Sequence, residues 1–216
     1  MIIDTKFKKM RILDMKIWKF VITGGPCAGK TEAVKIVKQD LINKGLKVIV
    51  VPETATELIS SEITPWELGR DEFQFLLLER SLNKEETAQK AAECFEQDVV
   101  IIYDRGLLDG KAYMKPEVFM NELKKYNEDE KTVLDRYNAV FHLVTTANGA
   151  ENFYTLLNNE ARTESIKDAI KLDDNLIDVW SNHKNFKIID NSTNFELKME
   201  RLLKEIDCVI NNNNNN

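Results

Sequence analysis

Apolar residues along the chain occur in two alternating arrangements. Short apolar runs with no polar alternation lie at residues 18–23, 46–51, 99–103, 139–144 and 186–189. Between these runs, apolar residues recur at helical spacing, as in the stripe of Met199, Leu202 and Ile206. Unbroken apolar strands separated by helices are typical of a parallel sheet that is covered on both faces. The pattern predicts a three-layer α/β/α domain of the P-loop NTPase class, with a five-stranded, mostly parallel sheet.

The first predicted strand runs into a glycine-rich loop, after which a helical pattern begins. A full match to G-x-x-x-x-G-K-[ST] is formed by Gly24, Gly25, Pro26, Cys27, Ala28, Gly29, Lys30 and Thr31. The glycines allow successive backbone N–H groups to point at phosphate oxygens, and the start of the helix adds a favourable potential. We expect Lys30 to reach the β and γ phosphates and Thr31 to offer its hydroxyl to Mg²⁺. The expected cofactors are ATP or GTP together with Mg²⁺.

The third predicted strand ends in an acid that is followed by an arginine, Asp104 and Arg105. If this strand lies beside the first, Asp104 is placed near Thr31 and can serve as a metal or metal-water ligand. Arg105 can bring positive charge to a phosphoryl group during transfer. The alternative is an Asp-Arg pair that caps a helix or forms a surface ion pair.

The second predicted strand also ends in an acid, Glu53. A carboxylate at this edge of the sheet can accept the proton of an acceptor hydroxyl, as a general base or as a substrate contact. The alternative role is a cap or first-turn acid for a helix that contains residues 56–59.

Two further polar positions follow the fourth and fifth predicted strands. Arg162 lies in a polar segment where a lid could close over the phosphates and exclude water, or else it lies along a helix surface. Asn191 follows the fifth strand, either in a loop beside the nucleotide base or in a plain turn. His142 and His183 are isolated in the sequence, which favours packing over catalysis.

Composition narrows the functional classes. The 216 residues are 43% hydrophobic and 31% charged, with a formal net charge of -6, which argues against binding to a nucleic-acid polymer. No apolar run is long enough for a membrane span. Three cysteines fit neither a disulfide framework nor a zinc site, which indicates a cytoplasmic protein. The expected parts are a basic extension at 1–17, the nucleotide-binding domain at 18–210 and a disordered poly-Asn tail at 211–216.

The chain resembles the small P-loop proteins, labelled AAA-domain ATPases, that include nicotinamide-riboside-kinase-like domains and the TRP channel translocation-defect protein. It is more distantly similar to deoxynucleoside and nucleotide kinases. The resemblance is carried by residues 22–31, 51–56, 73–74, 103–110, 161–164, 172–173 and 190–191. It implies that Glu53 handles the acceptor hydroxyl, that Gln74 contacts a base, and that Arg105 is the arginine after the metal-binding acid. Some members of this family are described as nucleotide and phosphoinositide binders.

The sequence is therefore consistent with two functions, a phosphotransferase and a nucleotide-dependent switch. In a phosphotransferase, ATP with Mg²⁺ donates its γ-phosphoryl group to a small, nucleoside-like acceptor, with charge carried by Lys30, Arg105 and Arg162. In a nucleotide-dependent switch, ATP or GTP orders the lid and recruits a protein or phosphoinositide partner. The first function predicts an acceptor pocket bounded by Glu53, Gln74 and Arg105, and the second predicts none.

Overall fold

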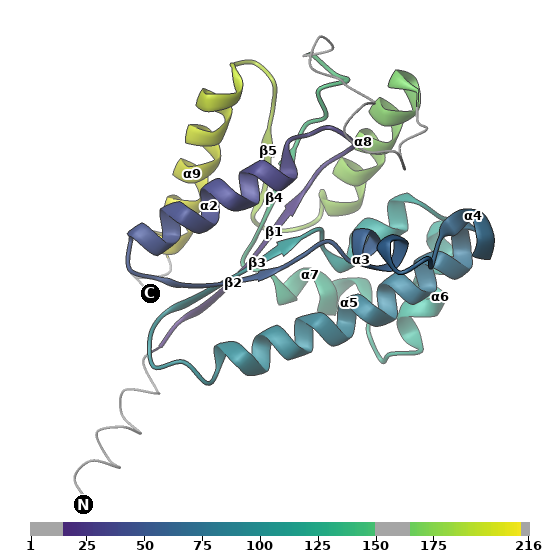
Figure 1. Cartoon of the computed structure of the whole chain (residues 1–216), viewed down its shortest axis with the longest axis horizontal. Coiled ribbons are helices and arrows are strands. Elements are labelled where there is room, and N and C mark those ends of the chain that lie inside the picture. The colour runs from purple at the N-terminus through teal and green to yellow at the C-terminus, as the bar shows by residue number, and fades with distance from the viewer. Residues whose placement is uncertain (1–14, 150–164, 213–216) are drawn as a thin grey trace, which may run out of the picture.

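In the part of the chain that the structure describes, five strands form a single parallel sheet. Figure 1 shows the computed structural model, which describes residues 15–149 and 165–212. The spatial order of the strands is β2-β3-β1-β4-β5, and every neighbouring pair runs parallel. The strands are β1 (Ile17–Thr23), β2 (Lys47–Val51), β3 (Val99–Asp104), β4 (Ala139–Leu143) and β5 (Phe186–Ile189). The predicted fold class is confirmed, with a sheet that is parallel throughout.

Helices cover both faces of the sheet (Figure 1). One face packs against α2 (Lys30–Asn43) and α9 (Phe195–Asn212), and the other packs against α5 (Arg70–Ala92) and α8 (Ile166–Trp180). The shorter helical segments are α3 (Thr54–Ser60), α4 (Pro65–Leu68), the 3₁₀ helix η1 (Leu107–Ala112), α6 (Pro116–Lys124) and α7 (Glu130–Arg136). These segments lie in the connections that follow β2 and β3.

The core consists of two apolar clusters, one on each face of the sheet. Successive strand residues point to opposite faces, so Val21 and Ile22 of β1 belong to different clusters, and neither is exposed to solvent. The central strands β3, β1 and β4 are buried on both faces, which explains their lack of polar alternation. In the edge strand β5, Ile188 is 49% exposed.

The observed elements include three short helical segments that the apolar pattern did not predict, α4, η1 and α7. Helix α5 ends at Ala92, three residues before the apolar Phe95, and α9 ends at Asn212. Helix α7 was not expected, although Asp129 and Thr132 form the reciprocal capping box that starts it. This capping pair is a local signal that the apolar pattern alone does not contain.

Within the described ranges, no helix is both long enough and apolar enough to cross a lipid bilayer.

Candidate functional site

The loop from β1 to α2 takes backbone conformations that require its glycines. Gly24 has φ 145° and Gly29 has φ 86°, both in the region that L side chains rarely adopt. A Cβ atom on Gly24 would lie 2.1 Å from the carbonyl oxygen of Leu143, and one on Gly29 would lie 2.9 Å from the ring of Phe195. Both glycines therefore provide conformational freedom and space for close neighbours.

Side chains from the β4 connection and from α8 hold this loop in place. Thr145 donates a hydrogen bond to the carbonyl oxygen of Pro26, and Thr146 donates one of 3.1 Å to that of Cys27. From α8, the Oδ1 atom of Asp173 accepts a 2.7 Å hydrogen bond from the backbone N–H of Gly25. Three hydrogen bonds from outside the loop therefore support its conformation.

Asp173 is a buried acid to which the sequence assigned no function. Its side chain also lies 3.1 Å from Nε2 of the fully buried His142 and accepts the N–H of Thr145 at 3.3 Å. One signal was present in the sequence, because Asp173 falls on the apolar face of α8 in register with Ala169 and Leu176. A charged residue on an apolar helix face indicates a buried polar partner.

Lys30 points back into the loop. Its Nζ atom donates hydrogen bonds of 2.8 Å to the carbonyl oxygens of both Gly24 and Gly25. Burial and the nearby Arg105 guanidinium lower the pKa of Lys30 to about 8. A phosphate at this position would supply the negative charge that this buried ammonium lacks.

Asp104 and Thr31 provide the chemistry that a magnesium ion requires. Strands β1 and β3 are neighbours, with Ile22 paired in register with Asp104. The Oδ1 atom of Asp104 is buried and has no hydrogen-bond partner among the described residues. Burial, and then the neighbouring Glu53, raise the pKa of Asp104. Mg²⁺ prefers one or two carboxylate or hydroxyl ligands together with phosphates and water, so these two residues fit the ion.

Arg105 lies between two carboxylates. It forms an ion pair with Glu53 through Nε, and its Nη1 atom lies 3.3 Å from Oδ2 of Asp109. Although burial favours a protonated Glu53, Arg105 and Lys30 outweigh it and lower the pKa of Glu53 to about 2. Glu53 is also the N-cap residue of α3. Its side chain makes no hydrogen bond to the backbone of that helix, but its Oε2 atom accepts one of 2.8 Å from the Thr56 hydroxyl, while Oε1 faces Arg105.

The side chain of Asp109, in η1, forms hydrogen bonds with residues of β1 and α8 and also contacts Arg105. Its Oδ2 atom accepts a 2.7 Å hydrogen bond from the Thr23 hydroxyl, and its Oδ1 atom accepts one of 2.8 Å from Nε1 of Trp180. The side chain is almost fully buried. The sequence places Asp109 in the loop after Arg105, but its contacts with Thr23 and Trp180 depend on the packing of β1 and α8.

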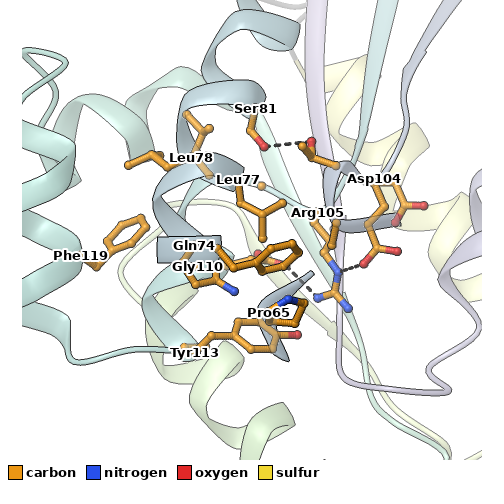
Figure 2. A pocket seen from close by; sticks show the side chains of 18 of the residues that line it. Pro65, Gln74, Leu77, Leu78, Ser81, Asp104, Arg105, Gly110, Tyr113 and Phe119 are labelled. Atoms are coloured by element: carbon orange, nitrogen blue, oxygen red, sulfur yellow. Dashed lines mark hydrogen bonds and ion pairs between the residues drawn. The ribbon is translucent and has the colours of Figure 1, made fainter. Parts of the chain in front are cut away.

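A pocket of about 940 Å³ opens beside this cluster. Glu53, Asp104 and Arg105 line it together with residues of α4, α5, η1 and α8. Figure 2 shows Gln74 of α5 in the wall of the pocket, between Phe119 and Arg105. Gln74 itself is 8% exposed. Apolar and aromatic side chains make up much of the remaining wall: Ile59, Pro65, Trp66, Phe73, Leu77, Leu78, Tyr103, Tyr113 and Phe119.

The sequence also predicted Arg162 and Asn191 as site residues. Arg162 lies outside the described residues. The side-chain amide of Asn191 donates hydrogen bonds of 2.8 and 2.7 Å to the carbonyl oxygens of Thr145 and Asn148, and its oxygen accepts one of 2.7 Å from Lys198. Asn191 therefore holds its own loop against the β4 connection.

Comparison with solved structures identifies proteins with the same fold. The chain is similar to a deoxyadenosine kinase from M. mycoides with bound dATP (17% identity, TM-score 0.56) and to the same kinase with bound dCTP (14%, 0.56). A third structure of that kinase, with the products dCMP and a flexible dCDP, gives 17% identity and a TM-score of 0.60. Each comparison covers 88% of this chain and 99% of the kinase.

Comparison with curated protein sequences gives no match. A family model described as an AAA domain matches residues 19–198, which include the loop, Glu53, the Asp104–Arg105 pair and Asp173. The chain therefore belongs to this AAA domain family of P-loop proteins.

Proposed function

We propose that the protein transfers the γ-phosphoryl group of Mg-ATP to a hydroxyl group of a small, nucleoside-like acceptor. The observation that carries this proposal is the pocket that Glu53, Gln74 and Arg105 line together with Asp104, the last residue of β3. A protein that only switches between nucleotide states has no need for a second, ligand-sized pocket at this point. Pockets of this volume are typical of small-molecule sites.

The donor would bind with its phosphates at the start of α2. Backbone N–H groups of the loop and the Lys30 ammonium would hold the phosphate oxygens. Thr31 and Asp104 would hold Mg²⁺, which neutralises charge on the phosphates when bound. Asp104 ends β3, and Thr31 is the second residue of α2, which follows the neighbouring strand β1. Ligands of parallel α/β proteins bind at this edge of the sheet, which supports the assignment.

The acceptor would lie in the pocket with its hydroxyl near Glu53. Phosphoryl transfer through a loose transition state needs little activation of the attacking oxygen, so orientation matters most. A carboxylate whose pKa is about 2 stays ionised at neutral pH and can accept the hydroxyl hydrogen bond. The oxygen–phosphorus bond forms while the bond to ADP breaks, and the hydroxyl proton leaves late, toward Glu53.

The aromatic lining of the pocket supports an acceptor with a flat ring. The aromatic side chains of Phe73, Tyr113 and Phe119 can contact such a ring, and the Gln74 amide can donate to and accept from its polar edge. Arg105 would add positive charge near the transferring group.

The test measures ADP release from ATP with Mg²⁺ in the presence of a panel of nucleosides and of ribosides that serve as vitamin precursors. We expect at least one acceptor to raise turnover well above the acceptor-free rate. Glu53→Gln should lower that turnover about 10²-fold or more while it spares nucleotide affinity. Glu57→Gln is the matched control, because Glu57 of α3 pairs with Arg80 and Lys84 outside the pocket. ATP binding with no acceptor-dependent turnover would favour the switch.

A further inference from the structure

Glu85 of α5 is a buried carboxylate in the wall of the acceptor pocket, and the proposed transfer assigns no role to it. Its side chain lines the pocket although the residue is only 5% exposed. The lining residues Leu78, Tyr103 and Leu107 are buried as well, whereas Trp66, which also lines the pocket, is 65% exposed. Glu85 therefore belongs to the inner part of the pocket, away from the solvent.

Two side chains at the end of α7 hold the Glu85 carboxylate. The hydroxyl of Tyr137 donates a hydrogen bond of 2.5 Å to Oε1, and the Nη1 atom of Arg136 donates one of 3.3 Å to Oε2. A carboxylate offers about four lone-pair positions to hydrogen-bond donors. Within the described residues these two contacts are the hydrogen bonds of the Glu85 side chain, so about half of its acceptor positions remain for a group that enters the pocket.

The negative charge of Glu85 is only partly balanced by its surroundings. Arg136 also forms an ion pair with Glu128 through Nη2, so one guanidinium serves two carboxylates. Burial outweighs Arg136 and the more distant Lys19 of β1, and it raises the pKa of Glu85 to about 7. Tyr103 of β3 stays neutral beside it, because burial and then Glu85 raise the pKa of that phenol. A further hydrogen-bond donor would therefore stabilise the Glu85 carboxylate.

Glu85 and Glu53 line separate parts of the same pocket. The hydroxyl of Ser81 donates a 2.9 Å hydrogen bond to that of Thr54, the residue after Glu53. Glu85 follows Ser81 one helical turn later on α5, which is about 5.4 Å along the helix axis. Gln74 lies on the same helix about three turns before Glu85, so Gln74 and Glu85 would contact different edges of a ligand. A small ligand in the pocket can thus approach both carboxylates.

We propose that Glu85 selects acceptors whose ring carries an N–H donor, such as an exocyclic amine. This inference rests on the proposed transfer to a nucleoside-like acceptor, and it narrows the class of that acceptor. With its hydroxyl oriented by Glu53, the acceptor would extend its ring toward the inner part of the pocket, where the amine would donate to Glu85. A ring without the donor would leave the buried carboxylate with neither water nor a new partner at that position, and it would bind less tightly.

The test compares acceptors that differ in one amine. Calorimetry in the presence of Mg-AMPPNP at pH 8 measures binding of adenosine and of purine riboside, which lacks the 6-amino group. Cytidine and pyrimidin-2-one riboside, which lacks the 4-amino group, form a second pair. We expect the amine to strengthen binding about tenfold or more in at least one pair.

Variants of Glu85 show whether this preference depends on the carboxylate. Glu85→Met keeps the length of the side chain but has no carboxylate, so it should remove the preference for the amine. Glu85→Gln keeps a neutral acceptor and should reduce the preference. Glu86→Gln is the matched control, because Glu86 is the next residue on α5, is exposed and pairs with Lys90.

The same ligand pairs give a pH-dependent measurement that a purely structural role of Glu85 would not change. A carboxyl group with a pKa of about 7 is mostly ionised at pH 8 and mostly protonated at pH 6, and the ionised form is the better acceptor for an amine. In the wild type, the preference for the amine should therefore fall by up to about tenfold from pH 8 to pH 6. In Glu85→Gln it should not vary with pH.

Two results would overturn the inference. The first is equal affinity, or no binding, within both ligand pairs for the wild type, and this result needs no variant to fold. The second is a preference for the amine that persists in a folded Glu85→Met protein, as checked by thermal unfolding. Amine-dependent binding without phosphoryl transfer would contradict the proposed function and leave the role of Glu85 intact, whereas transfer that ignores the amine would do the reverse.

Discussion

The carboxylate of Asp173 accepts a 2.7 Å hydrogen bond from the backbone N–H of Gly25, which is 148 residues away in the sequence. This contact joins α8 to the phosphate-binding loop. The same carboxylate lies 3.1 Å from Nε2 of His142 and accepts the Thr145 N–H. The shape of the loop therefore depends on a residue that no part of the loop motif contains.

Replacing Asp173 by Asn should loosen the loop. An amide presents one N–H face where the carboxylate presents only acceptors, so one of the two backbone donors loses its partner. We expect the free energy of unfolding to fall by about 1–3 kcal/mol and Mg-ATP affinity to fall with it. Urea unfolding and calorimetry measure both. Asp174→Asn, on the exposed side of the same helix, should change neither. Wild-type values for Asp173→Asn would contradict the role assigned to this contact.

Lys30 should make triphosphate binding depend on pH. In the free protein, burial and then Arg105 lower the pKa of Lys30 to about 8, whereas bound phosphate favours the charged form. Affinity for Mg-ATP should therefore fall as pH rises above 8, by up to about tenfold per pH unit. Calorimetry between pH 7 and 9.5 measures this slope.

Lys30→Ala should weaken Mg-ATP about tenfold or more and should remove that slope. If the slope persists in Lys30→Ala, the titrating group is another one, such as Lys198, whose pKa burial also lowers to about 8. Lys35→Ala, on an exposed position of α2, serves as the control for charge removal.

Glu53 should contribute to stability in a pH-dependent manner. Burial alone would raise its pKa, but Arg105 and Lys30 lower it to about 2, below the ordinary value of 4.5. A carboxyl group whose pKa is lower in the folded state stabilises that state above pH 4.5 and loses this contribution as the pH falls toward 2. The difference in unfolding free energy between the wild type and Glu53→Gln should therefore shrink between pH 6 and pH 3. A constant difference over that range would count against the ion pair.

Removal of the buried Asp109 side chain should cause a large loss in the free energy of unfolding. Asp109→Ala would leave the Trp180 indole N–H and the Thr23 hydroxyl without their acceptor and Arg105 without one of its two carboxylates. We expect a loss of about 3 kcal/mol or more in unfolding free energy, measured by urea titration. Trp180→Phe removes only one donor to Asp109, so the lost hydrogen bond should lower the unfolding free energy by less than Asp109→Ala does. The exposed Asp71→Ala variant should stay close to the wild type.

Much of the fold could be predicted because its signals are local. The apolar runs of β1, β3 and β4 required a sheet buried on both faces, and the loop motif required a phosphate-binding turn before α2. Those inferences need only the order of residues, since hydrophobic period and turn chemistry act over a few positions. The short helix α7 was missed because its signal is the capping pair of Asp129 and Thr132, which the apolar pattern does not contain.

Some features of the candidate site likewise follow from local sequence, whereas others depend on tertiary packing. By itself, the sequence determined the phosphate-binding loop and the placement of Glu53, Asp104 and Arg105 after their strands, because parallel strands bring their carboxyl ends to one edge. Only the tertiary structure decided that Asp109 and Asp173 support that edge, that Asn191 holds its own loop, and that Phe195 reaches Gly29. Those contacts join residues far apart in the chain, and they arise from the packing of α8 and α9 against the sheet, which no local pattern encodes.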